Sequence, residues 1–212
     1  MKRKKRKSPK IRRVFKGKLL KVFVKKVKIG HRWFTREIVQ KKNAAAFLVY
    51  DPAQDAVVLV SQIREAMRSR KNRNGLTTEV SAGHLEGLDI RADIAREASE
   101  ELGASISENQ IVMLNKEEMV AVSPGWTSEL LALAFIELRP GQLDRAKKKF
   151  GLACEGERIT RKFVPVSTLE TTPLQDLKTF ALVQWFLKER AKKRSQELTE
   201  DLRAVSRMED RF

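Results

Sequence analysis

The distribution of apolar side chains predicts β-strands in the first part of the chain. Residues 18–29 and 31–40 alternate apolar with basic or polar side chains on either side of Gly30. A period of two is typical of half-exposed strands, and a glycine between two such runs favours a hairpin. Two more continuously apolar runs, 44–51 and 56–64, are separated by the turn sequence DPAQD and are expected to be core strands.

The apolar period lengthens in the middle of the chain. Ile90, Ile94, Ala98 and Leu102 recur at intervals of four, and Gly103 follows them. This spacing predicts a helix that ends at the glycine. Further strands are expected at 76–83, 111–126, 129–138 and 161–169, with a polar insertion at 139–157 and a long helix from Leu174 onward. Strands interleaved with helices predict an α/β fold.

The positive charge of the chain is confined to its beginning. Of the formal net charge of +17, residues 1–36 contribute 17 Lys/Arg and no acid, whereas residues 37–212 hold 27 of each sign. A basic arm of this kind can hold phosphate polymers without sequence preference, or it can remain a solvated segment. Because residues 1–13 contain no aromatic side chain, the solvated arm is the simpler interpretation, and nucleic acid is a possible partner only through this tail.

Membrane and disulfide chemistry find little support in the sequence. No apolar run approaches the roughly 20 residues that a membrane-spanning helix needs. Cys154 is the only cysteine, so no disulfide can form within the chain. A reducing cytoplasm and no membrane partner are the expectations that follow.

Three glutamates crowd one turn of the predicted helix. Glu97, Glu100 and Glu101 are spaced at i, i+3 and i+4, so their carboxylates share one patch and repel each other by a few tenths of a kcal/mol per pair. A hard divalent cation would compensate this repulsion, and Mg²⁺ is the ion that oxygen clusters of this kind suit, with Mn²⁺ as a substitute. The alternative is a solvated acidic face, partly neutralised by Arg91 and Arg96.

The flanks of the acidic turn resemble the Nudix box, a loop–helix signature of phosphoanhydride hydrolases. The stretch EVSAGHLEGLDIRADIAREASEELG, residues 79–103, matches its glycine, its loop acid and its Arg-Glu-apolar-x-Glu-Glu-x-Gly core. The matching residues are Gly83, Asp89, Arg96, Glu97, Ala98, Glu100, Glu101 and Gly103. Asp89 stands where glutamate is usual, and the spacer before Arg96 is one residue shorter than the common form, as in some members that hydrolyse GDP-mannose.

The resemblance extends over roughly residues 17–190, toward the ADP-ribose pyrophosphatases of the family. The segments that carry it are 47–66, EVSAG at 79–83, SPGWTSELL at 123–131, GLACEGERI at 151–159 and QDLKTFALVQWF at 175–186. It implies an α/β/α sandwich around a mixed sheet, a small N-terminal antiparallel sheet, and a homodimer with that sheet at the interface. The domains expected are a basic disordered tail (1–13), a hairpin that forms the dimerisation sheet (14–42), the Nudix catalytic domain (43–190) and a charged helical extension (191–212).

The resemblance also implies roles for individual residues. The metal ligands would be the Ala82 carbonyl and the carboxylates of Glu97, Glu100, Glu101 and Glu157. Glu155 or Glu157, on the late acidic loop, would be the general base, and Arg96 belongs to the catalytic signature. Arg64 would contact substrate phosphate, with Glu79 assigned to the same binding site. A nucleobase also needs a flat partner, for which Trp33, Phe34 and Trp126 are the candidates.

The activity implied is Mg²⁺-dependent hydrolysis of the pyrophosphate bond of nucleoside diphosphate sugars, giving a nucleoside monophosphate and a sugar phosphate. ADP-ribose is the first expected substrate and GDP-mannose the second. Two other classes remain open. The first is a Nudix pyrophosphohydrolase that acts on RNA 5′ ends held by the basic arm. The second is a non-catalytic Nudix-like binding module, which the presence of all three box glutamates disfavours.

Overall fold

The N-terminal part of the chain forms a small antiparallel sheet of three strands. The computed structural model describes residues 11–87, 89–152 and 156–209. The strands are β1 (Ile11–Lys16), β2 (Leu20–Ile29) and β3 (Arg32–Lys41), in the order β1-β2-β3. The predicted hairpin is confirmed, with Gly30 in the left-handed conformation at φ 58°. The predicted end of the tail at residue 13 is wrong, because β1 begins at Ile11 and pairs with β2; the rest of the tail lies outside the described residues.

A mixed sheet forms the centre of the body. Its main strands are β11 (Thr160–Pro165), β5 (Ala56–Ile63), β4 (Ala44–Asp51), β10 (Leu130–Glu137) and β8 (Val112–Met113), hydrogen-bonded in that order. Strands β4 and β10 run parallel, and the other pairs are antiparallel. Three short strands complete it: β6 (Leu76–Glu79) on β5, β7 (Ser81–His84) on β4 and β9 (Val120–Ala121) on β10.

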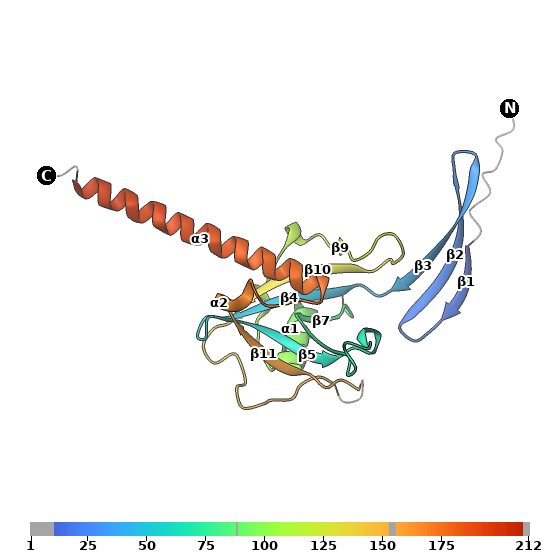
Figure 1. Cartoon of the computed structure of the whole chain (residues 1–212), viewed down its shortest axis with the longest axis horizontal. Coiled ribbons are helices and arrows are strands. Elements are labelled where there is room, and N and C mark those ends of the chain that lie inside the picture. Colours follow the sequence, from blue (N-terminus) through green and yellow to red (C-terminus); the bar gives the residue numbers. More distant parts are fainter. Residues whose placement is uncertain (1–10, 88, 153–155, 210–212) are drawn as a thin grey trace.

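Helices cover both faces of this sheet, so the predicted α/β/α sandwich is confirmed (Figure 1). Helix α1 (Ile90–Leu102) begins at its N-cap Asp89, which accepts hydrogen bonds from the backbone N–H groups of residues 91 and 92, and it ends at Gly103 with φ 59°. Helix α3 (Leu177–Glu209) lies on the other face, next to the short α2 (Val166–Leu169). The 3₁₀ turns are η1 (Glu65–Met67), η2 (Glu108–Gln110) and η3 (Asn115–Glu117).

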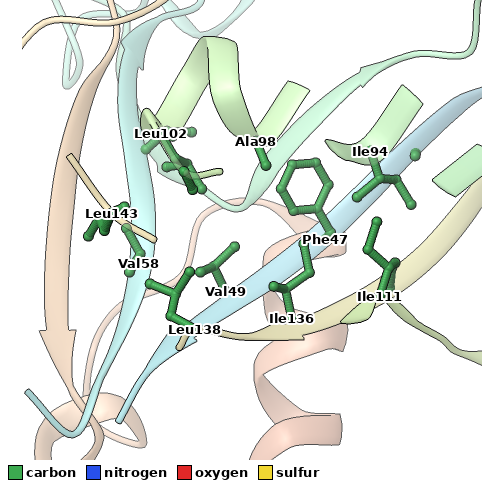
Figure 2. Packing of buried hydrophobic residues seen from close by; sticks show 14 of the residues in the cluster. Phe47, Val49, Val58, Ile94, Ala98, Leu102, Ile111, Ile136, Leu138 and Leu143 are labelled. Atoms are coloured by element: carbon green, nitrogen blue, oxygen red, sulfur yellow. The ribbon is translucent and has the colours of Figure 1, made fainter. Parts of the chain in front are cut away.

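The alternation of strand residues creates two apolar cores. Phe47 of β4 and Val58 of β5 point to the face that α1 covers, where Ile94, Ala98 and Leu102 pack against them (Figure 2). The intervening residues of the same strands meet Leu182, Val183 and Phe186 of α3 on the opposite face. Strands buried on both faces are continuously apolar, which is the pattern that predicted β4 and β5.

Three predicted elements differ in detail. The strand expected at 76–83 is broken at Val80 into β6 and β7, which pair with different neighbours. The strand expected at 111–126 is reduced to β8 and β9, because Asn115, Lys116 and Glu117 adopt positive φ between them. The strand expected at 161–169 ends at Pro165, where α2 begins.

Two parts of the molecule extend from the body. Helix α3 continues without a break across the predicted boundary at 190/191, and residues 191–200 are all exposed. The helix end and the N-terminal sheet project from different sides of the body (Figure 1). Within the described residues, no helix combines the length and the hydropathy that crossing a membrane requires.

Candidate active site

The close packing of β7 on α1 places the acidic turn against the sheet. A Cβ built on Gly83 would lie 1.9 Å from Cδ of Glu97, far inside the 3.0 Å that non-bonded carbon atoms keep between them. Only glycine therefore leaves room for the Glu97 carboxylate at this position. The shape of the loop before α1 also depends on Asp93, whose Oδ2 accepts hydrogen bonds from the backbone N–H groups of Glu86 (2.9 Å) and Gly87 (3.0 Å).

Arg96 binds two of the three box glutamates. Its Nη2 lies 3.0 Å from Oε1 of Glu97, and its Nη1 lies 2.9 Å from Oε2 of Glu100. A longer contact of 3.5 Å joins Nη2 to Asp93. The guanidinium therefore holds both carboxylates at the surface of the helix, and its positive charge offsets the repulsion between them.

Glu101 differs from its neighbours because it is buried without a cation. Only 3% of the residue is exposed, and its Oε2 accepts a hydrogen bond of 3.3 Å from the backbone N–H of Ala82. Burial, followed by the charge of Glu97, raises the pKa of Glu101 to about 8. Burial likewise raises the pKa of Glu97 to about 7, although Arg96 opposes the shift. Ionising either carboxylate is costly here. A bound cation would offset this cost, because it favours the ionised form.

The late acidic loop reaches the same place. Phe150 and Ile159 exchange backbone hydrogen bonds of 2.9 and 3.0 Å, which close the loop between them. The N–H of Gly151 donates to the carbonyl of Glu100 (3.1 Å), so the loop rests on the end of α1. Oε2 of Glu157 accepts from the N–H of Leu152 (3.1 Å), and the Glu157 charge contributes to the raised pKa values of Glu97 and Glu101. Glu155 and Cys154 lie outside the described residues.

A chain of ion pairs links β5, β6 and α3 beside the acidic helix. Nε of Arg64 lies 2.7 Å from Oε1 of Glu79, and Nζ of Lys178 lies 2.6 Å from Oε2. Burial lowers the pKa of Arg64, but the hydrogen bond and charge of Glu79 and the charges of Glu101 and Glu157 outweigh it, and the pKa ends above its ordinary value. Both carboxylate oxygens of Glu79 are thus paired with cations of the protein, and these contacts position Arg64.

The start of α3 fixes the break between β6 and β7. The hydroxyl of Thr179, which is completely buried, accepts a hydrogen bond of 2.9 Å from the N–H of Val80. Asp176 in turn accepts from the N–H and the hydroxyl of Thr179, and it lies 2.9 Å from Lys178. The segment KTF could have suggested this contact in the sequence, but its partner is 99 residues away. The sequence suggested KTF and Asp176 only as a brace of the C-terminal helix, whereas the structure joins Thr179 and Lys178 to β6 and the β6–β7 break.

The chemistry of these ligands fits a divalent cation. All are oxygens: the Ala82 carbonyl and the carboxylates of Glu97, Glu100 and Glu101. In the described residues, no three acidic, histidine or cysteine side chains are gathered around one point, and Arg96 is paired with two of the glutamates. A cation would satisfy the buried Glu101, which has no ion pair in the described residues, and would compete with Arg96 for the other two.

The predicted aromatic residues do not all reach this site. Trp33 pairs with Lys28 next to the Gly30 turn, about 26 Å along β3 from Lys41, where the strand enters the body. Trp33 and Phe34 also point to opposite faces of the N-terminal sheet, so they cannot stack on one base together. Trp126 is 57% exposed, and its carbonyl accepts from the N–H of Val39 at the body end of β3 (2.7 Å).

A single chain therefore brings together only part of the site that the sequence predicts. The residues that the structure brings together are Arg64, Glu79, Ala82, Arg96, Glu97, Glu100, Glu101 and Glu157. Trp33 and Phe34 remain on the projecting sheet. Asp89 serves as the N-cap of α1.

Comparisons with known proteins agree with this arrangement. The chain is 29% identical over 154 residues to the GDP-mannose pyrophosphatase of Salmonella typhimurium, which covers 71% of this chain and 76% of that protein. It is 34% identical over 149 residues to the ADP-ribose pyrophosphatase of Haemophilus influenzae, covering 64% of each. No family model matches the chain. The crystal structure of an ADP compounds hydrolase shares the fold, with a TM-score of 0.64 and 15% identity over 90% of this chain and 98% of that one. The box glutamates on α1, the glycine beneath them and these relatives together support the resemblance of the chain to the Nudix hydrolases.

Proposed function

We propose that the chain hydrolyses the pyrophosphate bond of nucleoside diphosphate sugars, with ADP-ribose preferred and GDP-mannose next. The observation that carries the proposal is the meeting of Glu97, Glu101 and Glu157 near Arg64: the charges of Glu101 and Glu157 raise the pKa of Arg64, and the charge of Glu157 raises the pKa of Glu97 and of Glu101. The named relatives act on ADP-ribose and on GDP-mannose, and both substrates contain this bond.

The resemblance to Nudix pyrophosphatases implies a divalent metal cofactor, and we assign Mg²⁺, which Mn²⁺ could replace. Glu97, Glu100, Glu101 and the Ala82 carbonyl would hold it. The bound cation would neutralise charge on the pyrophosphate and lower the pKa of the attacking water. The raised pKa values of Glu97 and Glu101 mean that protons compete with the metal for these ligands.

Arg64 would bind a substrate phosphate. Glu79 accepts the hydrogen bond of its Nε at 2.7 Å, and the two terminal nitrogens of the guanidinium make no hydrogen bond within the described residues. Two parallel N–H donors suit two phosphate oxygens, a geometry that lysine does not offer. Arg64 would thus fix the pyrophosphate, while Glu79 and Lys178 keep the guanidinium in place.

Glu157 or Glu155 would accept the proton of the attacking water. Oε2 of Glu157 is held by the Leu152 N–H, so Oε1 is the oxygen left for this proton. As the water oxygen bonds to one phosphorus, the bridging P–O bond breaks and its electrons pass to the leaving phosphate. The products are a nucleoside monophosphate and a sugar phosphate.

We infer further that the enzyme works as a homodimer in the cytoplasm. A three-stranded sheet with no layer packed over it has little stability of its own, and its exposed apolar residues include Phe15 (54% exposed) and Trp33 (57% exposed). We assign the contact between copies to the face that carries these two residues. A second copy could bring Trp33 to a site that this chain leaves without a base-stacking residue, and Trp126 could serve from within the chain.

A substrate panel tests the proposed function. ADP-ribose, GDP-mannose, other nucleotide sugars, dinucleotides and capped RNA are incubated with Mg²⁺ or with EDTA, and the nucleotide products are separated by chromatography. We expect nucleoside monophosphate from ADP-ribose with Mg²⁺ and none with EDTA. Hydrolysis of capped RNA alone, or no hydrolysis of any nucleotide sugar with either metal, would overturn the proposal.

A further inference from the structure

The N-terminal sheet carries the positive charge of the described chain. Residues 11–42 contain 12 Lys/Arg, and Glu37 is their only acidic residue. Residues 43–212 contain 25 Lys/Arg and 26 Asp/Glu. The projecting sheet is therefore strongly basic beside a body that is close to neutral, so its charge cannot be a consequence of overall composition.

The pairing register divides these cations between two faces. Residues directly opposite each other in an antiparallel pair point to the same side, so the face that holds Lys21 also holds every second residue of β2 and its partners in β1 and β3. We call this the basic face. It consists of Ile11, Arg13, Lys16, Lys21, Phe23, Lys25, Val27, Ile29, Arg32, Phe34, Arg36, Ile38 and Gln40. Six of these residues are cations and none is an acid, whereas Glu37 lies on the other face.

Two pairs of like charges stand directly opposite each other on the basic face. Lys16 is the partner of Lys21, and Lys25 is the partner of Arg36. Like charges in this position destabilise a sheet, and in the described residues none of the four makes a salt bridge. The arrangement costs stability and no carboxylate in the described residues offsets it, so an anionic partner is its physical explanation.

Aromatic rings lie among the cations. Phe34 is 37% exposed, and the guanidinium of Arg36 lies 5.6 Å from the centre of its ring. Phe23 is half-buried on the same face. Single-stranded nucleic acid offers phosphates to cations and flat bases to aromatic rings and guanidinium planes, and open sheet faces with both kinds of side chain bind it. An anionic lipid surface would use the cations, but a ring held beside a guanidinium on the sheet is poorly placed to insert into a lipid layer.

We propose that the basic face of the N-terminal sheet binds single-stranded nucleic acid. The interaction is largely independent of sequence and is distinct from the hydrolase site on α1. It uses the face of the sheet opposite to the one assigned to the contact between copies. The cations hold the phosphate backbone, while Phe34 and the Arg36 guanidinium stack on bases.

The test compares two double variants of the full chain. Lys21→Gln/Lys25→Gln removes two charges from the basic face, and Lys26→Gln/Lys28→Gln removes two charges from the same strand on the other face. Binding of a fluorescent 12-nucleotide single-stranded RNA is measured by anisotropy between 50 and 300 mM salt. We expect Lys21→Gln/Lys25→Gln to weaken binding at least fivefold and to lower the salt slope by about 1.4, at about 0.7 per phosphate contact. We expect the matched variant to change binding less than twofold.

Folding and lipid binding are controlled separately. Because Lys21→Gln/Lys25→Gln relieves like-charge pairs, its Tm should equal or exceed that of the wild type; if it does not fold, Arg32→Gln/Arg36→Gln on β3 replaces it. Equal losses in both double variants would show a general charge effect and overturn the proposal. It is also overturned if the wild type fails to bind the RNA at 100 mM salt, or if vesicles with 30% phosphatidylserine, but not RNA, bind in a face-dependent manner.

Discussion

Glu101, as a proposed metal ligand, would couple metal binding to pH. Its carboxylate is buried between β7 and α1, and both burial and Glu97 penalise its charge. A cation reverses this penalty because it interacts only with the ionised form. The ionised Glu101 carboxylate therefore destabilises the metal-free protein, whereas it would stabilise the metal-bound protein.

The first expected outcome concerns stability and pH. The pKa values of Glu97 and Glu101 are raised to about 7 and about 8, above the value of about 4.3 for an unfolded glutamate. The neutral carboxyl groups are thus tolerated at low pH, and the metal-free protein should lose stability as pH rises through 7 to 8. Differential scanning fluorimetry with EDTA should show this loss, and Mg²⁺ should raise Tm more at pH 8.5 than at pH 6.

The variant Glu101→Gln supplies both a control and a second prediction. It keeps the shape of the side chain but removes its charge, so the fold should persist and the EDTA melting curve should depend less on pH. Turnover of ADP-ribose should fall on the order of a hundredfold or more, because a metal ligand is lost. Wild-type kcat in this variant would contradict the ligand assignment.

At the scale of elements, the N-terminal end of α3 organises the part of the site that contains Glu79 and Arg64. The Thr179 hydroxyl accepts a hydrogen bond from the N–H of Val80, which lies between β6 and β7, and Lys178 forms an ion pair with Glu79. One helix end thereby sets the positions of two neighbouring short strands. Arg64, through Glu79, depends on the same helix.

We expect Lys178→Met to weaken substrate binding more than catalysis. Glu79 is buried, and without Lys178 it would be paired with Arg64 alone. Glu79 would then attract the Arg64 guanidinium more strongly and draw it away from the substrate phosphate. The KM for ADP-ribose should rise about fivefold to tenfold with a smaller change in kcat, as expected for a positioning residue. Steady-state kinetics measures both constants.

Lys192→Met is the matched control on the same helix. Lys192 and Lys178 each lie 2.6 Å from a glutamate, but the Lys192 pair with Glu189 is exposed. Exposed pairs contribute about 0–1 kcal/mol, so this variant should leave both Tm and KM unchanged. Equal effects of the two substitutions would show that Glu79 does not transmit the change to Arg64.

At the scale of the whole molecule, the projecting sheet and the acidic helix act in different places. Residues 11–42 hold 12 Lys/Arg and the exposed Trp33, and the sheet that they form projects from the body that contains α1 (Figure 1). A projecting three-stranded sheet needs a second layer for its stability. The proposed homodimer provides that layer and leaves the basic face open.

The oligomeric state can be measured directly. Light scattering after size-exclusion chromatography should give twice the chain mass of 24.3 kDa for the wild type. Phe15→Asp/Trp33→Asp places charges on the face assigned to the contact, and it should shift the mass toward that of one chain. Lys26→Gln/Lys28→Gln on the same face should remain dimeric. A fully active monomer at micromolar concentration would contradict the proposed assembly.

Local sequence alone determined the elements with strong periods. The alternation on either side of Gly30, the apolar runs of β4 and β5, and the stripe of α1 between Asp89 and Gly103 all depend on near neighbours in the chain. The acidic turn is equally local, because three glutamates within five positions must share one helix surface. These features were accordingly predicted with their approximate bounds.

Only the tertiary structure decided how distant groups meet. The break at Val80, the pairing of Glu79 with Lys178, and the burial of Glu101 depend on contacts between segments far apart in the chain. Periodicity carries no information about such contacts, since it describes which side of an element faces a core but not which segment covers it. For the same reason, the sequence suggested aromatic partners for a base, whereas the register of β3 placed Trp33 and Phe34 on opposite faces of a sheet that leaves the body.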